Sequence, residues 1–95
     1  MPKAYLVAHI RVHDPEEFER FKDLSQHAIN EHGCRVLARN PNPEIKEGDV
    51  SGTVILIEFD DIAAARAFYA SDAYRAARAE REVSATTDLM LVEGD

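Results

Sequence analysis

A histidine and an arginine share one face of the first predicted strand. Residues 3–13 alternate in polarity, and His9 and Arg11 both stand at odd positions, so their side chains point to the same side of a sheet. We expect Glu58 and Arg39, from two later strands, to lie on this side as well. A histidine there could act as a general base, and an arginine could bind a carboxylate or enolate through two hydrogen bonds. His9 is therefore the candidate catalytic residue.

The same polar residues allow a purely structural interpretation. His9, Glu58 and the arginines could form paired polar contacts across a subunit interface, because ion-pair networks cluster titratable groups without catalysing a reaction. Asp88 would project on the same side and could join such a network. The sequence leaves the two interpretations open.

Hydroxyl groups form a second candidate cluster. Tyr69, Ser71 and Tyr74 follow one another closely and could line a cleft between a helix and the sheet; alternatively, both rings pack in the core and Ser71 caps a helix. The complete predicted ligand pocket consists of His9, Arg11, Arg39, Glu58, Tyr69 and Tyr74. In contrast, Arg66, Arg75, Arg78 and Arg81 are interleaved with glutamates and alanines. This pattern predicts that all four arginines lie on a solvent-exposed helix face.

Histidine spacing argues against a metal site within one chain. His9 and His13 are four residues apart on a strand, or about 13 Å, and His27 and His32 are about 140° apart around a helix. Cys34 is the single cysteine, which excludes an intramolecular disulfide and predicts a buried, inert thiol. We therefore expect neither a metal nor another cofactor.

Size and charge limit the class of protein. The chain has 95 residues, a mass of 10.6 kDa and a net charge of -7, so we predict one domain over residues 1–95 and disfavour nucleic acid or an anionic membrane as partner. Hydrophobic residues make up 45% and charged residues 31%, which is typical of a globular protein. Without an apolar run of 18 residues or a signal peptide, the expected location is the cytoplasm.

Periodicity and helix caps predict the elements. Asp14-Pro15 opens a helix that ends at Gly33, and an Asp at 60 or 61 caps a second helix that restarts at Ser71-Asp72 and runs to Glu82. The prolines and glycines of residues 40–52 predict a loop. The predicted strands are residues 3–13, Cys34–Arg39, Thr53–Phe59 and Thr87–Glu93.

The order of these elements predicts an α+β, ferredoxin-like βαββαβ fold, with a four-stranded antiparallel sheet and two helices on one face. We assign Val36, Ala38, Ile55, Ile57, Phe59, Leu89, Leu91 and the even positions of the first strand to the helix side. The outer side would still be largely apolar, with Tyr5, Val7, His9, Leu37, Val54, Leu56, Met90 and Val92. Such a face is too apolar to be left in water, so a two-fold-related copy should cover it.

The whole chain resembles the dimeric α/β-barrel proteins and, among them, the family called domain of unknown function 1330. The resemblance rests on Lys3-Ala4-Tyr5, Asp14-Pro15-Glu16, Glu31-His32-Gly33, Leu37-Ala38-Arg39, Glu47-Gly48, Ile57-Glu58-Phe59, Ala67-Phe68-Tyr69 with Ser71 and Tyr74, and Leu91-Val92-Glu93-Gly94. It implies the dimeric α/β-barrel fold and a homodimer, but no reaction.

Three functions remain open at this level. The first is a homodimeric protein that binds a small metabolite, with carboxylated metabolites among the candidates. The second is a cofactor-independent monooxygenase or isomerase acting on a small phenolic or lactone substrate, in which His9, with Arg39 or Glu58, would remove a proton beside a carbonyl. The third is an assembly domain whose only role is its interface.

Overall fold

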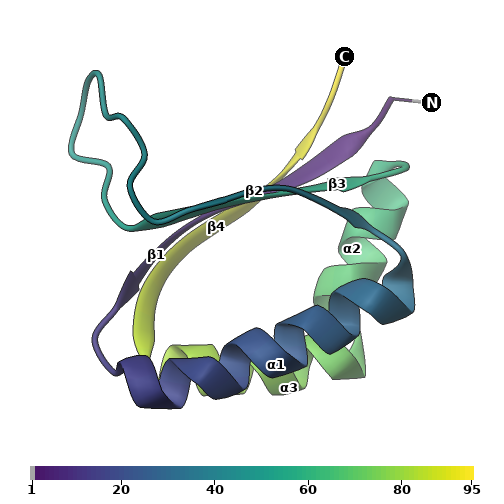
Figure 1. Cartoon of the computed structure of the whole chain (residues 1–95). Coiled ribbons are helices and arrows are strands. Elements are labelled where there is room, and N and C mark those ends of the chain that lie inside the picture. The colour runs from purple at the N-terminus through teal and green to yellow at the C-terminus, as the bar shows by residue number, and fades with distance from the viewer. Residues whose placement is uncertain (1) are drawn as a thin grey trace.

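The elements form close to the expected positions in a computed structural model that describes residues 2–95 (Figure 1). The last strand begins at Ala85, two residues earlier than predicted, because its pairing with the first strand continues to Val12. The bounds are β1 Ala4–Val12, α1 Pro15–His32, β2 Arg35–Asn40, β3 Thr53–Phe59, α2 Ile62–Ala70, α3 Asp72–Glu82 and β4 Ala85–Glu93.

Side-chain caps fix where the helices begin. The Asp14 carboxylate accepts a hydrogen bond from the backbone N–H of Glu17 at 3.1 Å, and Pro15 occupies the first turn of α1, where its missing N–H costs nothing. Ser71 separates α2 from α3, and its hydroxyl oxygen accepts from the N–H of Tyr74 at 3.1 Å. Gly33 ends α1 with a φ of 66°, a left-handed conformation that favours glycine.

The strands form one antiparallel sheet in the order β2-β3-β1-β4. All three helices lie on one face of it, and within residues 2–95 no helix or further strand covers the other face (Figure 1). This arrangement confirms the predicted α+β ferredoxin-like fold. The connection 41–52 rises from the sheet on the side away from the helices (Figure 1).

The hydrophobic core lies between this sheet and the three helices. Phe68 is fully buried and packs with its ring centroid 5.3 Å from that of Phe59 and 4.7 Å from that of Tyr74. Alternate residues of β1 supply the sheet side of the core, as the period of two predicts. They are Ala4, Leu6, Ala8 and Ile10, each at most 2% exposed.

A β-bulge in β2 corrects the predicted orientation of its second half. Val36 pairs with Ile57 on the helix side, but the register shifts before Ala38, which pairs with Leu56 on the outer face. The shift leaves Leu37 as the extra residue, and an extra residue reverses the side to which the following side chains point. Ala38 is therefore on the outer face, and Arg39, which was expected there, is on the helix side.

The outer face of the sheet is open in the single chain. Leu37, Met90 and Val92 are 50%, 51% and 41% exposed, although they lie beside other apolar side chains of the same face. The pairing of β1 with β4 extends one step beyond the strands, where the N–H of Gly94 donates to the Lys3 carbonyl at 2.7 Å. None of the helices in residues 2–95 is both long enough and apolar enough to cross a bilayer.

Candidate functional site

A cavity of about 550 Å³ lies between α1 and the sheet. This volume is within the range of small-molecule sites. Most of its lining is apolar and comes from β1, β3 and the inward face of α1. The lining residues are Leu6, Ala8, Ile10, Val12, Pro15, Phe18, Glu19, Phe21, Lys22, Ser25, Ile29, Arg39, Pro41, Thr53, Ile55, Ile57, Tyr74 and Arg81.

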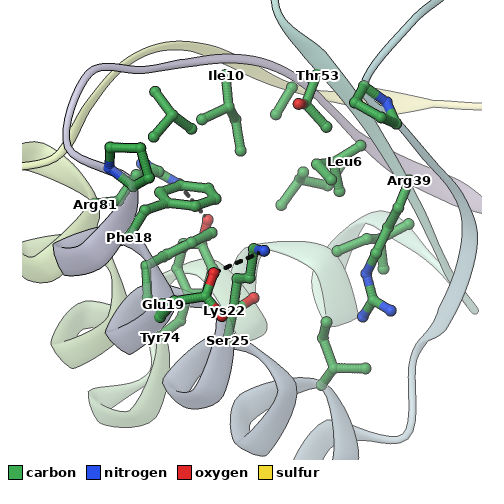
Figure 2. Close-up of a pocket in the computed structure, with 18 residues that line it drawn as sticks. Leu6, Ile10, Phe18, Glu19, Lys22, Ser25, Arg39, Thr53, Tyr74 and Arg81 are labelled. Carbon is green, nitrogen blue, oxygen red and sulfur yellow. Dashed lines mark hydrogen bonds and ion pairs between the residues drawn. The ribbon is translucent and has the colours of Figure 1, made fainter.

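A buried arginine lies at one end of this cavity (Figure 2). Arg81 is only 5% exposed, and its Nη1 donates a hydrogen bond to the hydroxyl oxygen of Tyr74 at 2.5 Å. Its guanidinium carbon is 5.5 Å from the ring centroid of Phe21 and 5.7 Å from that of Tyr74. Within residues 2–95 no acidic side chain forms an ion pair with Arg81. The cationic group is thus held by aromatic rings and one neutral oxygen.

Tyr74 keeps its proton at neutral pH. Its side chain is 3% exposed, and burial raises the pKa of its hydroxyl, although the charge of Arg81 and the hydrogen bond from it act in the opposite direction. Because the Tyr74 oxygen already accepts from Arg81, the group that it can still offer to another molecule is its O–H.

The rim of the cavity is more polar and more exposed. Lys22 and Glu19 of α1 form an ion pair at 2.9 Å (Figure 2). Arg39, at the opposite end from Arg81 in the same view, donates from Nη2 to Oε1 of Gln26 at 2.6 Å. The β2 bulge places Arg39 in this position, and the hydrogen bond joins β2 to α1 beside the opening.

Three of the predicted pocket residues lie on the outer face of the sheet and do not line this cavity. His9 and Arg11 alternate with the buried even residues of β1, and Glu58 alternates with buried residues of β3. Two of the three are in ion pairs: Arg11 contacts Asp88 at 2.9 Å, and Glu58 contacts Arg35 at 2.7 Å. The sequence interpretation placed Arg39 on this face with them, whereas the bulge in β2 turns Arg39 to the helix side.

His9 has no hydrogen-bond partner for one ring nitrogen. Its Nδ1 is buried without a partner in the described chain, and the residue lies opposite Val54 and Asp88 in the sheet.

Arg39 and Tyr74 are the predicted pocket residues that line the cavity. Tyr69 lies outside it: its ring centroid is 5.6 Å from that of Tyr74, and the Arg78 guanidinium stacks over it at 5.0 Å. Ser71 caps α3, and Cys34 is half-buried, with burial raising the pKa of its thiol.

Arg81 is a buried cavity residue that the sequence interpretation missed, and its assignment to a solvated face was wrong. The signal was present: Tyr74, Ala77 and Arg81 follow a spacing of three and four residues, so they share one stripe of α3, and all three are buried. Because α3 packs against α1 and α2 as well as the sheet, this stripe faces the interior and carries the arginine with it.

The sheet order and the helices on one face define a ferredoxin-like α+β protein, and a cavity of small-molecule size lies between its helices and sheet. Within this class the chain belongs to the family described as Domain of unknown function (DUF1330), whose model matches residues 3–95. No protein of the curated set is significantly similar to it in sequence.

Solved structures agree with the fold. A protein of unknown function from Rhodopseudomonas palustris is 15% identical, with a TM-score of 0.75 over 99% of this chain and 83% of its own. A dimeric ferredoxin-like protein of unknown function from Jannaschia sp. CCS1 is 14% identical, with a TM-score of 0.72 over 97% and 99%. SnoaB, a cofactor-independent oxygenase from Streptomyces nogalater, is 13% identical, with a TM-score of 0.62 over 100% and 95%. At these identities the likeness concerns the fold alone.

Proposed function

We propose that this protein binds a small, largely apolar metabolite in the cavity between α1 and the sheet. The observation that carries the proposal is the combination of a 550 Å³ apolar cavity with a few converging polar groups, among them Tyr74 and Arg81. Ligand sites in proteins have this composition: an apolar wall supplies affinity and a small number of polar groups fixes orientation. A carboxylated metabolite fits the basic groups of the lining.

We further propose that the functional unit is a homodimer formed through the outer face of the sheet. The apolar side chains of that face and the projecting connection 41–52 support it. The Jannaschia protein of the same fold, described as dimeric, provides an analogy. Packing two outer faces together would leave both cavities on the helix sides and open to ligand.

The alternative, a cofactor-independent oxygenase or isomerase, has support from the fold of SnoaB, which is an argument from analogy. His9, its proposed base, lies on the opposite face of the sheet from the cavity. Arg11 and Glu58 are engaged in ion pairs on that face. Metabolite binding is therefore the function that the geometry supports best.

A cavity-filling variant tests the binding proposal. Ser25→Trp adds a large side chain at the α1 wall of the cavity, whereas Asp23→Trp adds the same side chain to the exposed side of α1. In a thermal-shift screen of small organic acids and neutral aromatic compounds, a ligand that binds the native state raises the Tm. We expect some compounds to raise the Tm of both the wild type and Asp23→Trp, and these compounds should leave the Tm of Ser25→Trp unchanged. Equal shifts for the two tryptophan variants would place binding elsewhere.

A further inference from the structure

We propose that Arg81 and Tyr74 form an anion-recognition pair, so that the ligand is a monocarboxylate with an apolar body. The inference rests on the proposed function and specifies it: it states which end of the cavity binds the charged group and which chemical class the cavity selects. An aromatic or branched-chain carboxylic acid has the required combination of one charge and an apolar remainder.

Burial of an uncompensated charge is the first argument. Arg81 is nine-tenths buried or more, and the one hydrogen bond of its guanidinium among residues 2–95 goes to a neutral hydroxyl oxygen. Placing a cation in such a site costs free energy unless an anion or several acceptors compensate it. The native fold carries this cost at a cavity wall, where a bound anion would remove it.

Donor geometry is the second argument. Arg81 has five N–H donors and no acceptor, and one of the five is used by Tyr74. The Tyr74 O–H is a second donor with no acceptor among the described residues. Two adjacent donor groups, one of them a guanidinium, match the two oxygens of a carboxylate, and a charge-assisted pair of this kind is stronger than a neutral one. A neutral amide would place its own N–H₂ against donors.

The charge of the cavity lining is the third argument. The lining contains three basic side chains, Lys22, Arg39 and Arg81, and one acidic side chain, Glu19, although the whole chain carries a net charge of -7. A basic cavity in an acidic protein attracts anions locally. Phe18 lies beside Arg81 (Figure 2), and the Phe21 ring centroid is 5.5 Å from the Arg81 guanidinium carbon. Both rings line the cavity and would contact the apolar body of the ligand.

Matched acid and amide probes test the inference. Calorimetric titration would compare phenylacetate with phenylacetamide, and 4-methylpentanoate with its primary amide, on the full chain at one pH and ionic strength. We expect each acid to bind the wild type about 10- to 100-fold more tightly than its amide, as hydrogen bonds to a charged group predict. Arg81→Met should remove this preference, and Tyr74→Phe should reduce it.

Arg75→Met is the matched control, because Arg75 is exposed on the same helix and does not line the cavity; it should keep the preference. If Arg81→Met does not fold, Tyr74→Phe, which removes only one oxygen, decides the question. Binding of acid and amide with equal affinity, abolished by Ser25→Trp, would overturn the anion-recognition pair but leave the cavity as a binding site. A preference unchanged in Arg81→Met and Tyr74→Phe would also overturn it. If neither the acids nor the amides bind, the anion-recognition pair and the proposed binding function both fail.

Discussion

Arg39 lies opposite Ile55 in the ladder between β2 and β3, on the face that bears the cavity. Simple alternation from Val36 would place it on the other face, and the bulge at Leu37 accounts for the difference. The bulge therefore brings a basic side chain to the rim of the cavity and allows its hydrogen bond to Gln26.

The position of Arg39 predicts a modest, salt-dependent effect on binding. Arg39→Gln should weaken the binding of phenylacetate by about two- to fivefold, because exposed charges contribute at most about 1 kcal/mol, and it should make the affinity less sensitive to NaCl. Thermal stability should change little, since the side chain is exposed. Arg35→Gln serves as the comparison on the outer face, and an equal loss of affinity there would refute a local role for Arg39.

Gly52 is required by the close approach of the loop to β1. Its φ is 96°, and a Cβ at this position would lie 2.5 Å from the Ile10 carbonyl oxygen. Gly52→Ala should therefore lower the free energy of unfolding by about 2–3 kcal/mol, since the backbone oxygen cannot move away cheaply. Urea unfolding provides the measurement.

Gly48→Ala is the control for this substitution. Gly48 also has a positive φ, 89°, but an added Cβ would meet only a Val50 methyl at 3.8 Å. Its cost should be limited to the left-handed conformation, about 1 kcal/mol. Equal losses for the two variants would show that the contact with Ile10 is not decisive.

Glu17 of α1 and Glu80 of α3 predict a pH dependence of stability. The adjacent Glu80 carboxyl group, which can hydrogen-bond to Glu17 only when a proton is shared between them, raises the pKa of Glu17 above its ordinary 4.5. A raised pKa means that the folded state binds this proton more tightly than the unfolded state, so this contribution to stability grows as the pH falls through the raised pKa toward 4.5 and is absent at neutral pH.

Removing the charge of Glu17 should therefore stabilise the protein at pH 7. Glu17→Gln is expected to have a higher Tm than the wild type at pH 7, with a difference that shrinks as the pH approaches 4.5. Glu16→Gln, one residue earlier on α1, corrects for the change in net charge. A gain that is the same for both variants at every pH would contradict the pairing with Glu80.

The outer face predicts the oligomeric state. Sedimentation at micromolar concentration should give a particle of twice 10.6 kDa. Leu56→Glu places a charge at the centre of that face, beside Val7 and Ala38, and should dissociate the dimer because a charge without a partner is costly to bury. Ala76→Glu, on the exposed side of α3, should leave it intact. A wild-type monomer would contradict the proposed assembly.

Local signals account for what the sequence predicted correctly. The Asp14, Asp61 and Ser71 caps and the left-handed Gly33 depend on neighbouring residues alone, as does the alternation in β1. These features determine element boundaries, and the order of elements then determines the fold.

The site was harder to predict because it depends on tertiary packing. The bulge in β2 depends on its register with β3, and the burial of Arg81 depends on α3 lying beside α1. The composition of α3, rich in arginine, glutamate and alanine, is typical of a solvent-exposed helix. Its buried stripe becomes evident only when Tyr74 and Ala77 are considered together with Arg81.

Side-chain NMR of the arginine Nε–H groups tests the central claim most directly. In a titration of the ¹⁵N-labelled wild type with phenylacetate, assigned through Arg81→Met, the Arg81 Nε–H resonance should shift in proportion to saturation. The shift at equal saturation with phenylacetamide should be clearly smaller. The outer-face Arg35 resonance should stay in place. If Arg81 remains unchanged while phenylacetate binds, the cavity does not recognise the carboxylate through this residue.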